Sequence, residues 1–131
     1  LTKILDRSTP PLPFWFKAWQ RQEIITPFND LIFAPMSVRF VGKALATLGE
    51  KRIPGTLHLS GAENVSYVTF AKELAKITNT STKLIQSTTA SEKGVHIAYK
   101  PKYSGLSMEK TTNLSGLKPQ TLESVVSDLS K

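Results

Sequence analysis

The sequence of 131 residues contains no cysteine and only two histidines. The absence of cysteine excludes disulfide bonds, thiol catalysis and cysteine-ligated metal sites. His58 and His96 are too few and too isolated to indicate a metal cluster. We interpret His58 as a strand residue beside a packed helix, and we expect no metal site.

Long apolar runs are also missing, because no stretch approaches the roughly 20 residues of a membrane span. No apolar segment is followed by a small-residue cleavage site, so no signal peptide is predicted. We therefore expect a cytoplasmic protein that does not associate with a membrane. The chain begins without Met on what looks like the middle of a strand. We expect it to be a fragment of a longer protein.

Recognisable catalytic motifs are absent as well. The sequence has no glycine-rich dinucleotide or P-loop pattern, no HExxH and no GxSxG. No spacing suggests a histidine–carboxylate pair beside a serine. Tyr67 precedes Lys72 by five positions and so misses a Tyr-x-x-x-Lys dyad by one. We expect neither a catalytic nor a cofactor-binding residue in this chain.

The composition is that of a folded domain, with 40% hydrophobic and 21% charged residues. The length predicts one domain over residues 1–131. The net charge is +7, and the one local excess is five lysines against Glu109 alone between residues 93 and 118. Such a patch could meet nucleic acid, an anionic membrane or a phosphorylated small molecule, or be a solvated face.

Residues 55–77 predict one strand-to-helix unit of an α/β protein. The alternation in residues 55–60 indicates a strand, and Gly61 ends it. Ser66 can cap the following helix, whose apolar stripe is Tyr67, Phe70, Leu74 and Ile77.

The rest of the chain adds further elements of both kinds. We predict strands at 1–5, 23–28, 31–37 and 83–89. We predict helices after the prolines at 10–13, at 38–51 behind Ser37, at 106–116 with Ser107 as its cap, and at 119–131. In the helix at 38–51 we expect Val38, Val41, Leu45 and Leu48 to be buried. The aromatic stripe around Trp15 is interpreted as core or inter-domain contact, or alternatively Trp15 or Phe14 faces a nucleotide base.

Four segments in order resemble the C-terminal half of the extended short-chain dehydrogenases/reductases. They are LTKIL, FNDLIFAPMSVRFVGKAL, GTLHLSGAENVSYVTFAKELA and LSMEKTTNLSGLKP. The chain is most similar to the sugar-nucleotide-binding part of the dTDP-dehydrorhamnose reductases and epimerases. The resemblance implies the late strands of a Rossmann-like sheet plus a small α/β substrate lobe.

The resemblance also implies a division of labour. Members bind NAD or NADP on a Rossmann sheet, and their glycine motif and Tyr-x-x-x-Lys dyad lie upstream of the segment that LTKIL matches. This chain would bind a nucleoside-diphosphate sugar, hold no cofactor itself and be inactive alone. Its strands would lack their neighbours, so we expect self-association or pairing with an N-terminal half.

The resemblance points to substrate-binding residues. Relatives carry Arg-Pro before the closing segment, where Lys100-Pro101 stands here with Lys102 beside it. A lysine suits phosphate as a compact cation. Ile32 stands where many relatives have an arginine, and Arg39 is the candidate to take over the role of that arginine. We name Lys100, Lys102, Arg39 and Trp15 as candidates for substrate contact.

Two alternatives stay open. One is a non-catalytic relative that acts as a binding or regulatory subunit. The other is an unrelated basic nucleic-acid-binding domain, although no aromatic-rich RNA motif or recognition helix supports it. We expect no nucleic-acid partner.

Overall fold

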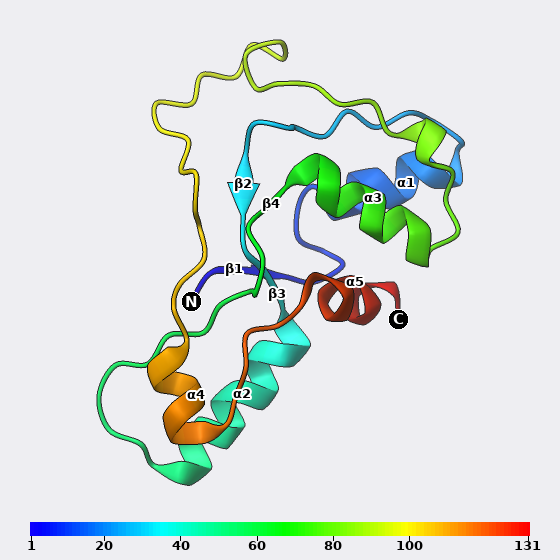
Figure 1. The fold of residues 1–131 in the computed structure, drawn as a ribbon. Coiled ribbons are helices and arrows are strands. Elements are labelled where there is room, and N and C mark those ends of the chain that lie inside the picture. Colours follow the sequence, from blue (N-terminus) through cyan, green and yellow to red (C-terminus); the bar gives the residue numbers. More distant parts are fainter.

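A computed structural model describes all residues from 1 to 131 as a mixed α/β fold (Figure 1). The elements in chain order are β1 (Lys3–Leu5), α1 (Leu12–Gln20), β2 (Ile32–Phe33), β3 (Pro35–Ser37), α2 (Val38–Lys51), β4 (Val65–Ser66), α3 (Tyr67–Ile77), the 3₁₀ turn η1 (Thr82–Leu84), α4 (Glu109–Ser115) and α5 (Leu122–Ser130). None of the helices is long and apolar enough to cross a membrane.

The strands form two small pairs. β1 runs parallel to β3, with Ile4 opposite Met36, and β2 runs antiparallel to β4. A two-stranded parallel sheet is unusual, because parallel strands are normally covered on both faces and joined by further strands. The pairing therefore agrees with a chain that carries only the late strands of a larger sheet.

The larger core lies between α1, α3 and α5, on the right in Figure 1. Phe70 and Leu74 of α3 and Val125 of α5 are almost fully buried there. The prediction of an inward stripe on α3 is confirmed for Phe70 and Leu74, whereas Ile77 near the end of the helix is 40% exposed.

A smaller core joins α2 and α4 to the strands. Met36, Val41, Ala44, Leu59 and Met108 form it. At its edge, Ser37 donates a hydrogen bond to Asp128 (2.6 Å), and the Ser37 amide donates to the side chain of Gln120 (2.8 Å). This polar network fixes the junction of β3 and α2 against α5.

Two of the three predicted serine caps, Ser37 and Ser66, are present. The amide of Phe40 donates to the Ser37 hydroxyl at 3.0 Å, and the amide of Thr69 donates to the Ser66 hydroxyl at 3.1 Å. Gly116 ends α4 with φ of 78°, as expected of a C-terminal glycine. That helix begins at Glu109, later than predicted, and its N-terminal cap is Met108, so the prediction of Ser107 as the cap was wrong.

Four strand predictions need correction. Residues 55–60 form no strand, although the amide of Thr2 donates to the carbonyl of Leu59 at 3.2 Å. Residues 31–37 contain two short strands with Ala34 between them, and each pairs with a different partner. Residues 23–28 and 83–89 meet only through single bridges, Ile25 to Ile85 and Phe28 to Thr88. Pro27 lacks an amide hydrogen, which prevents a continuous ladder there.

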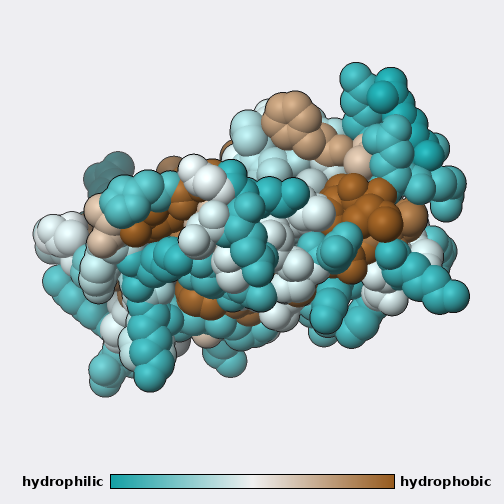
Figure 2. Space-filling model, turned by 90° about the horizontal axis from the view of Figure 1, so that it is seen from above, coloured by the Kyte–Doolittle hydropathy of each residue, from teal (hydrophilic) through white to brown (hydrophobic).

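The prediction of the buried face of α2 was wrong for two of its four residues, Val38 and Leu45. Val41 and Ala44 are buried, but Val38 and Leu45 are each 54% exposed. The helix turns its Val41 side toward the smaller core and leaves Val38, Leu45 and two glycines outside. Apolar side chains reach the surface elsewhere too, and Figure 2 shows separate brown areas among teal ones on one face.

Candidate functional site

An apolar hollow of about 370 Å³ lies between the start of α1, the segment 26–31 and the start of α3. Its walls are mainly prolines and aromatic rings. The prolines come from two segments, the start of α1 and the segment 26–31. The lining residues are Pro10, Pro11, Trp15, Thr26, Pro27, Phe28, Leu31 and Tyr67. Proline contributes no amide hydrogen and fixes its own φ, so these walls are stiff and poor in hydrogen-bond donors.

Two of the aromatic walls are held by the main core. Trp15 is 6% exposed and lies with its ring centroid 6.3 Å from that of Phe70. Tyr67 stacks on Phe33 with centroids 4.3 Å apart and planes 13° from parallel. Burial raises the pKa of Tyr67 above its ordinary 10.0, so its hydroxyl is neutral at pH 7. The packing fixes both rings before any ligand arrives.

A charged pair lies next to this hollow along the chain. Asp30, which precedes the lining residue Leu31, accepts a hydrogen bond from the ammonium of Lys100 and another from the amide of Ala90 at 3.1 Å. The Lys100 hydrogen bond is the main cause that lowers the pKa of Asp30. Lys100 also lines a second hollow of about 280 Å³ with Gly94, His96 and neighbouring residues.

This arrangement brings together two of the four candidate residues. Trp15 belongs to the apolar hollow, and Lys100 is tied to its border through Asp30. Stiff aromatic walls suit a flat ring, and a partly exposed ammonium suits an anionic group. The site could therefore hold a molecule with a flat apolar end and a negatively charged part.

The other candidates lie apart from this hollow. Arg39 is exposed on the first turn of α2, lines none of the five hollows and makes no hydrogen bond or ion pair. Lys102 is exposed, with its ammonium 5.4 Å from the ring centroid of Tyr103. Phe14, the alternative to Trp15, is 69% exposed and does not line the hollow.

Three residues of the site escaped the sequence analysis. Tyr67 was assigned to the buried stripe of its helix, Phe28 to the end of a strand, and Asp30 to the connection between two predicted strands. Phe28 and Asp30 share one signal in the sequence, their place in the short segment that follows Pro27. Only the fold shows that Asp30 meets Lys100, which lies 70 residues later in the chain.

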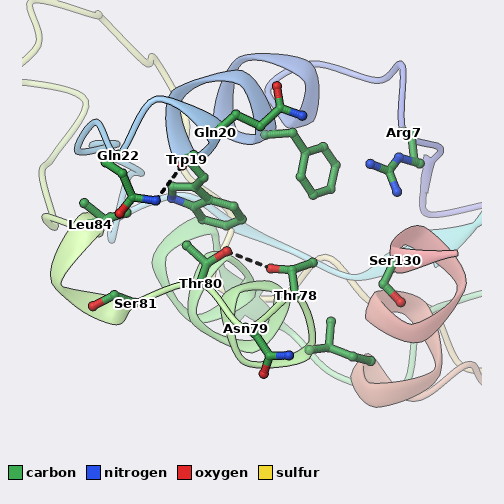
Figure 3. A pocket seen from close by; sticks show the side chains of 12 residues that line it. Arg7, Trp19, Gln20, Gln22, Thr78, Asn79, Thr80, Ser81, Leu84 and Ser130 are labelled. Atoms are coloured by element: carbon green, nitrogen blue, oxygen red, sulfur yellow. Dashed lines mark hydrogen bonds between the residues drawn. The ribbon is translucent and has the colours of Figure 1, made fainter.

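A larger hollow of about 680 Å³ lies where α1, α3 and α5 end (Figure 3), and Lys100 is not among its lining residues. Hydroxyl and amide side chains line most of it. Its one charged side chain, Arg7, already donates to the carbonyl of Leu129 at 3.4 Å and lies 4.5 Å over the ring of Phe16. Trp19 forms one wall, and its buried indole N–H has no hydrogen-bond acceptor. We assign this hollow no ligand.

The strand-to-helix junctions do not fit a dinucleotide. β3 passes directly into α2, and β4 directly into α3, and in each case a serine of the strand caps the helix. A dinucleotide pyrophosphate needs a glycine-rich turn that exposes backbone amides at a helix start. Neither junction has such a turn, so we derive no hydride-transfer step from the residues of this chain.

Comparison with known proteins gives a consistent picture. Residues 14–131 match the family model described as RmlD substrate binding domain. No curated protein matches the sequence.

Solved structures share the fold. One is a dTDP-4-dehydrorhamnose reductase from Bacillus anthracis str. Ames in complex with NADP (TM-score 0.80, 21% identity, 96% of this chain and 44% of that one). Another is a dTDP-4-dehydrorhamnose reductase from Yersinia enterocolitica (0.76, 15%, 97% and 47%). A third is a UDP-N-acetylglucosamine 4-epimerase from Methanobrevibacter ruminantium M1 in complex with UDP-N-acetylmuramic acid (0.68, 12%, 97% and 43%). The chain thus spans less than half the length of these structures, and the identities support likeness of fold alone.

Proposed function

The chain belongs to the RmlD substrate binding domain family, and from this premise we propose that it is the substrate-binding part of an NAD(P)-dependent reductase or epimerase that acts on a nucleoside-diphosphate sugar. The observation that carries the proposal is the aromatic hollow with a lysine tied to its border. A nucleoside-diphosphate sugar combines a flat base with a dianionic diphosphate. The base suits the aromatic hollow, and the diphosphate suits the ammonium of Lys100.

We assign the base to the hollow between Trp15, Phe28 and Tyr67. Aromatic rings favour offset or edge contacts with a flat ring, each worth about 0.5–1.5 kcal/mol beyond the buried area. The walls carry few donors, so they would hold a base by contact area more than by hydrogen bonds. The ribose and diphosphate would then extend along residues 28–31 toward Lys100.

We assign the diphosphate to Lys100. Its ammonium is a compact cation with three donors, which suits a phosphate without the fixed fork of an arginine. Lys102 follows Pro101 and adds positive charge to the same segment, and Arg39 offers an unpaired guanidinium. We propose these two as weaker contributors to the attraction of the anion.

The cofactor and the acid/base dyad would come from an N-terminal part of the same protein. NAD or NADP would supply the hydride when bound there. The role of this chain is to bind and orient the substrate and to shield it from water. The two-stranded parallel pair of β1 and β3 supports pairing with such a part. The outer edge of each strand presents backbone N–H and C=O groups that can pair with a further strand.

Replacement of Lys100 by alanine in the intact protein tests the proposal. We expect the affinity for a thymidine or uridine diphosphate sugar, measured by isothermal titration calorimetry, to fall about tenfold or more, since a hydrogen bond to a charged group is lost. Lys93→Ala is the matched control, because Lys93 lies in the same segment, is exposed and forms no ion pair. Equal affinities in the Lys100→Ala variant and the wild type would refute the assignment of the diphosphate.

A further inference from the structure

The long connection between η1 and α4, residues 85–108, is fixed to the rest of the chain near both of its ends. We call this connection the strap; it runs along the top and left edge of Figure 1. Near its start, the amide of Thr88 donates to Pro27 and the amide of Ala90 to Asp30. Near its end, the amides of Ser104 and Gly105 both donate to the side chain of Asn64 at 2.7 Å.

Between these ends the strap has one polar attachment. Residues 91–103 make no hydrogen bond or ion pair to any residue outside the strap except the bond from Lys100 to Asp30. The turn at 89–95 is closed by bonds within the strap itself, such as that from the Val95 amide to the Ala90 carbonyl at 2.9 Å. This ion pair is therefore the one polar contact that holds the middle part of the strap against the rest of the chain.

Asp30 acts on the strap at two points. Its carboxylate accepts from the Ala90 amide, with distances of 3.1 and 3.3 Å to its two oxygens, and one of these oxygens also accepts from Lys100. The Lys100 side chain is 38% exposed and that of Asp30 is 21% exposed, so solvent and small ions can reach the pair. Any anion that binds the Lys100 ammonium must compete with this carboxylate.

We propose that Asp30 is an internal competitor for Lys100, which holds the strap against the core in the absence of ligand and is replaced when an anionic ligand binds. The proposal rests on the proposed function for the identity of the anion, a diphosphate. When the ligand replaces Asp30 as the partner of the Lys100 ammonium, Asp30 keeps its hydrogen bond to the Ala90 amide. The middle of the strap can then move together with the ligand. Binding and strap movement are thereby coupled through one lysine.

Asp30→Asn separates the two bonds of the carboxylate. The asparagine oxygen still accepts from the Ala90 amide, whereas the charge that attracts Lys100 is gone. In the intact protein we expect the affinity for inorganic pyrophosphate to rise about two- to fivefold, the range of a partly exposed ion pair. Glu23→Gln is the matched control, because it changes the net charge by the same amount as Asp30→Asn. Glu23 is exposed, and its side chain makes no hydrogen bond or ion pair.

A double variant identifies the route of the effect. Asp30→Asn combined with Lys100→Ala should bind pyrophosphate no better than Lys100→Ala alone, since the competitor acts only on that lysine. Unchanged or weaker pyrophosphate binding in Asp30→Asn would overturn the proposal, and so would a gain that persists without Lys100.

Limited trypsin digestion tests the strap without any ligand. Cleavage after Lys93 and Lys102 should be faster in Asp30→Asn than in the wild type and in Glu23→Gln, with the sites identified by mass spectrometry. Equal cleavage rates would overturn the holding role of Asp30, even if nucleotide-sugar binding were intact. Conversely, faster cleavage in Asp30→Asn together with unaltered nucleotide-sugar binding in Lys100→Ala would refute the diphosphate assignment and keep the holding role.

Discussion

Single residues decide how closely the segments of this chain approach one another, and Gly61 is the clearest case. It is buried beside the backbone that leads into β3. An added Cβ would lie 2.9 Å from the carbonyl carbon of Ala34 and closer still to the carbonyl oxygen of Pro35. Backbone atoms cannot move aside as a flexible side chain can. The glycine is therefore required by contact, since its φ is not positive.

Gly61→Ala should lower the free energy of unfolding by about 1–3 kcal/mol, the usual cost of overpacking. Gly42→Ala is the matched control, because its Cβ would meet nothing within 4 Å and the residue lies inside α2. Alanine there should raise the stability by about 0.5–1 kcal/mol. Urea unfolding of both variants checks the opposite signs, and a neutral Gly61→Ala would contradict the close approach.

The sequence predicted those residues whose role follows from local chemistry. Ser37 and Ser66 were identified as helix caps because a cap depends on three or four neighbouring residues. Two interpretations of Trp15 stayed open, a core residue and a contact to a nucleotide base. The structure shows that Trp15 is buried and also lines the hollow. Asp30 could not be found, because its partners Ala90 and Lys100 are brought to it only by the fold.

At the scale of elements, the helices were predicted better than the strands. The amphipathic stripe of α3 needs only its own sequence, whereas a strand needs a neighbour at the right distance. Residues 55–60 alternate as a strand should, yet they accept only two backbone hydrogen bonds from other segments, from Thr2 to Leu59 and from Gln120 to Ser60. The pattern in the sequence fits a strand of a larger sheet, of which this chain holds two short parallel strands.

The outer face of α2 carries a stripe that the chain leaves uncovered. Val38 and Leu45 are exposed and lie seven residues apart. Gly42 lies between them and Gly49 lies one turn after Leu45, so the stripe has no large side chain at these two positions. The error in the predicted buried face arose because the apolar residues of this helix lie on two sides. The Val41 side packs against β1, β3 and α4, and the Leu45 side finds no partner within residues 1–131.

We expect the isolated chain of residues 1–131 to self-associate through this stripe and its open strand edges. Leu45→Lys should reduce the apparent mass in light scattering, because the charge would be desolvated in a contact. Ala46→Lys adds the same charge on the exposed surface off the stripe and should change the mass less. A compact monomer in the wild-type chain at all concentrations would contradict the expectation.

At the scale of the whole molecule, the fold class was correct and its division into two cores was not foreseen. The larger core of α1, α3 and α5 supports the aromatic hollow, and the smaller core of α2 and α4 supports the return of the strap. The order of segments predicted the family, because four short matches in sequence constrain the fold more than any one of them. Contacts between distant segments set the rest, and these depend on side-chain packing that no local pattern specifies.

The central claim is that this chain binds a nucleoside-diphosphate sugar, and calorimetric titration of the intact protein at low and high salt tests it most directly. We predict one-to-one binding of a thymidine or uridine diphosphate sugar that persists at high salt, because contact with the aromatic hollow is not screened. We predict no binding of duplex DNA or single-stranded RNA under the same conditions. Absence of nucleotide-sugar binding, or nucleic-acid binding that weakens steeply with salt, would contradict the account.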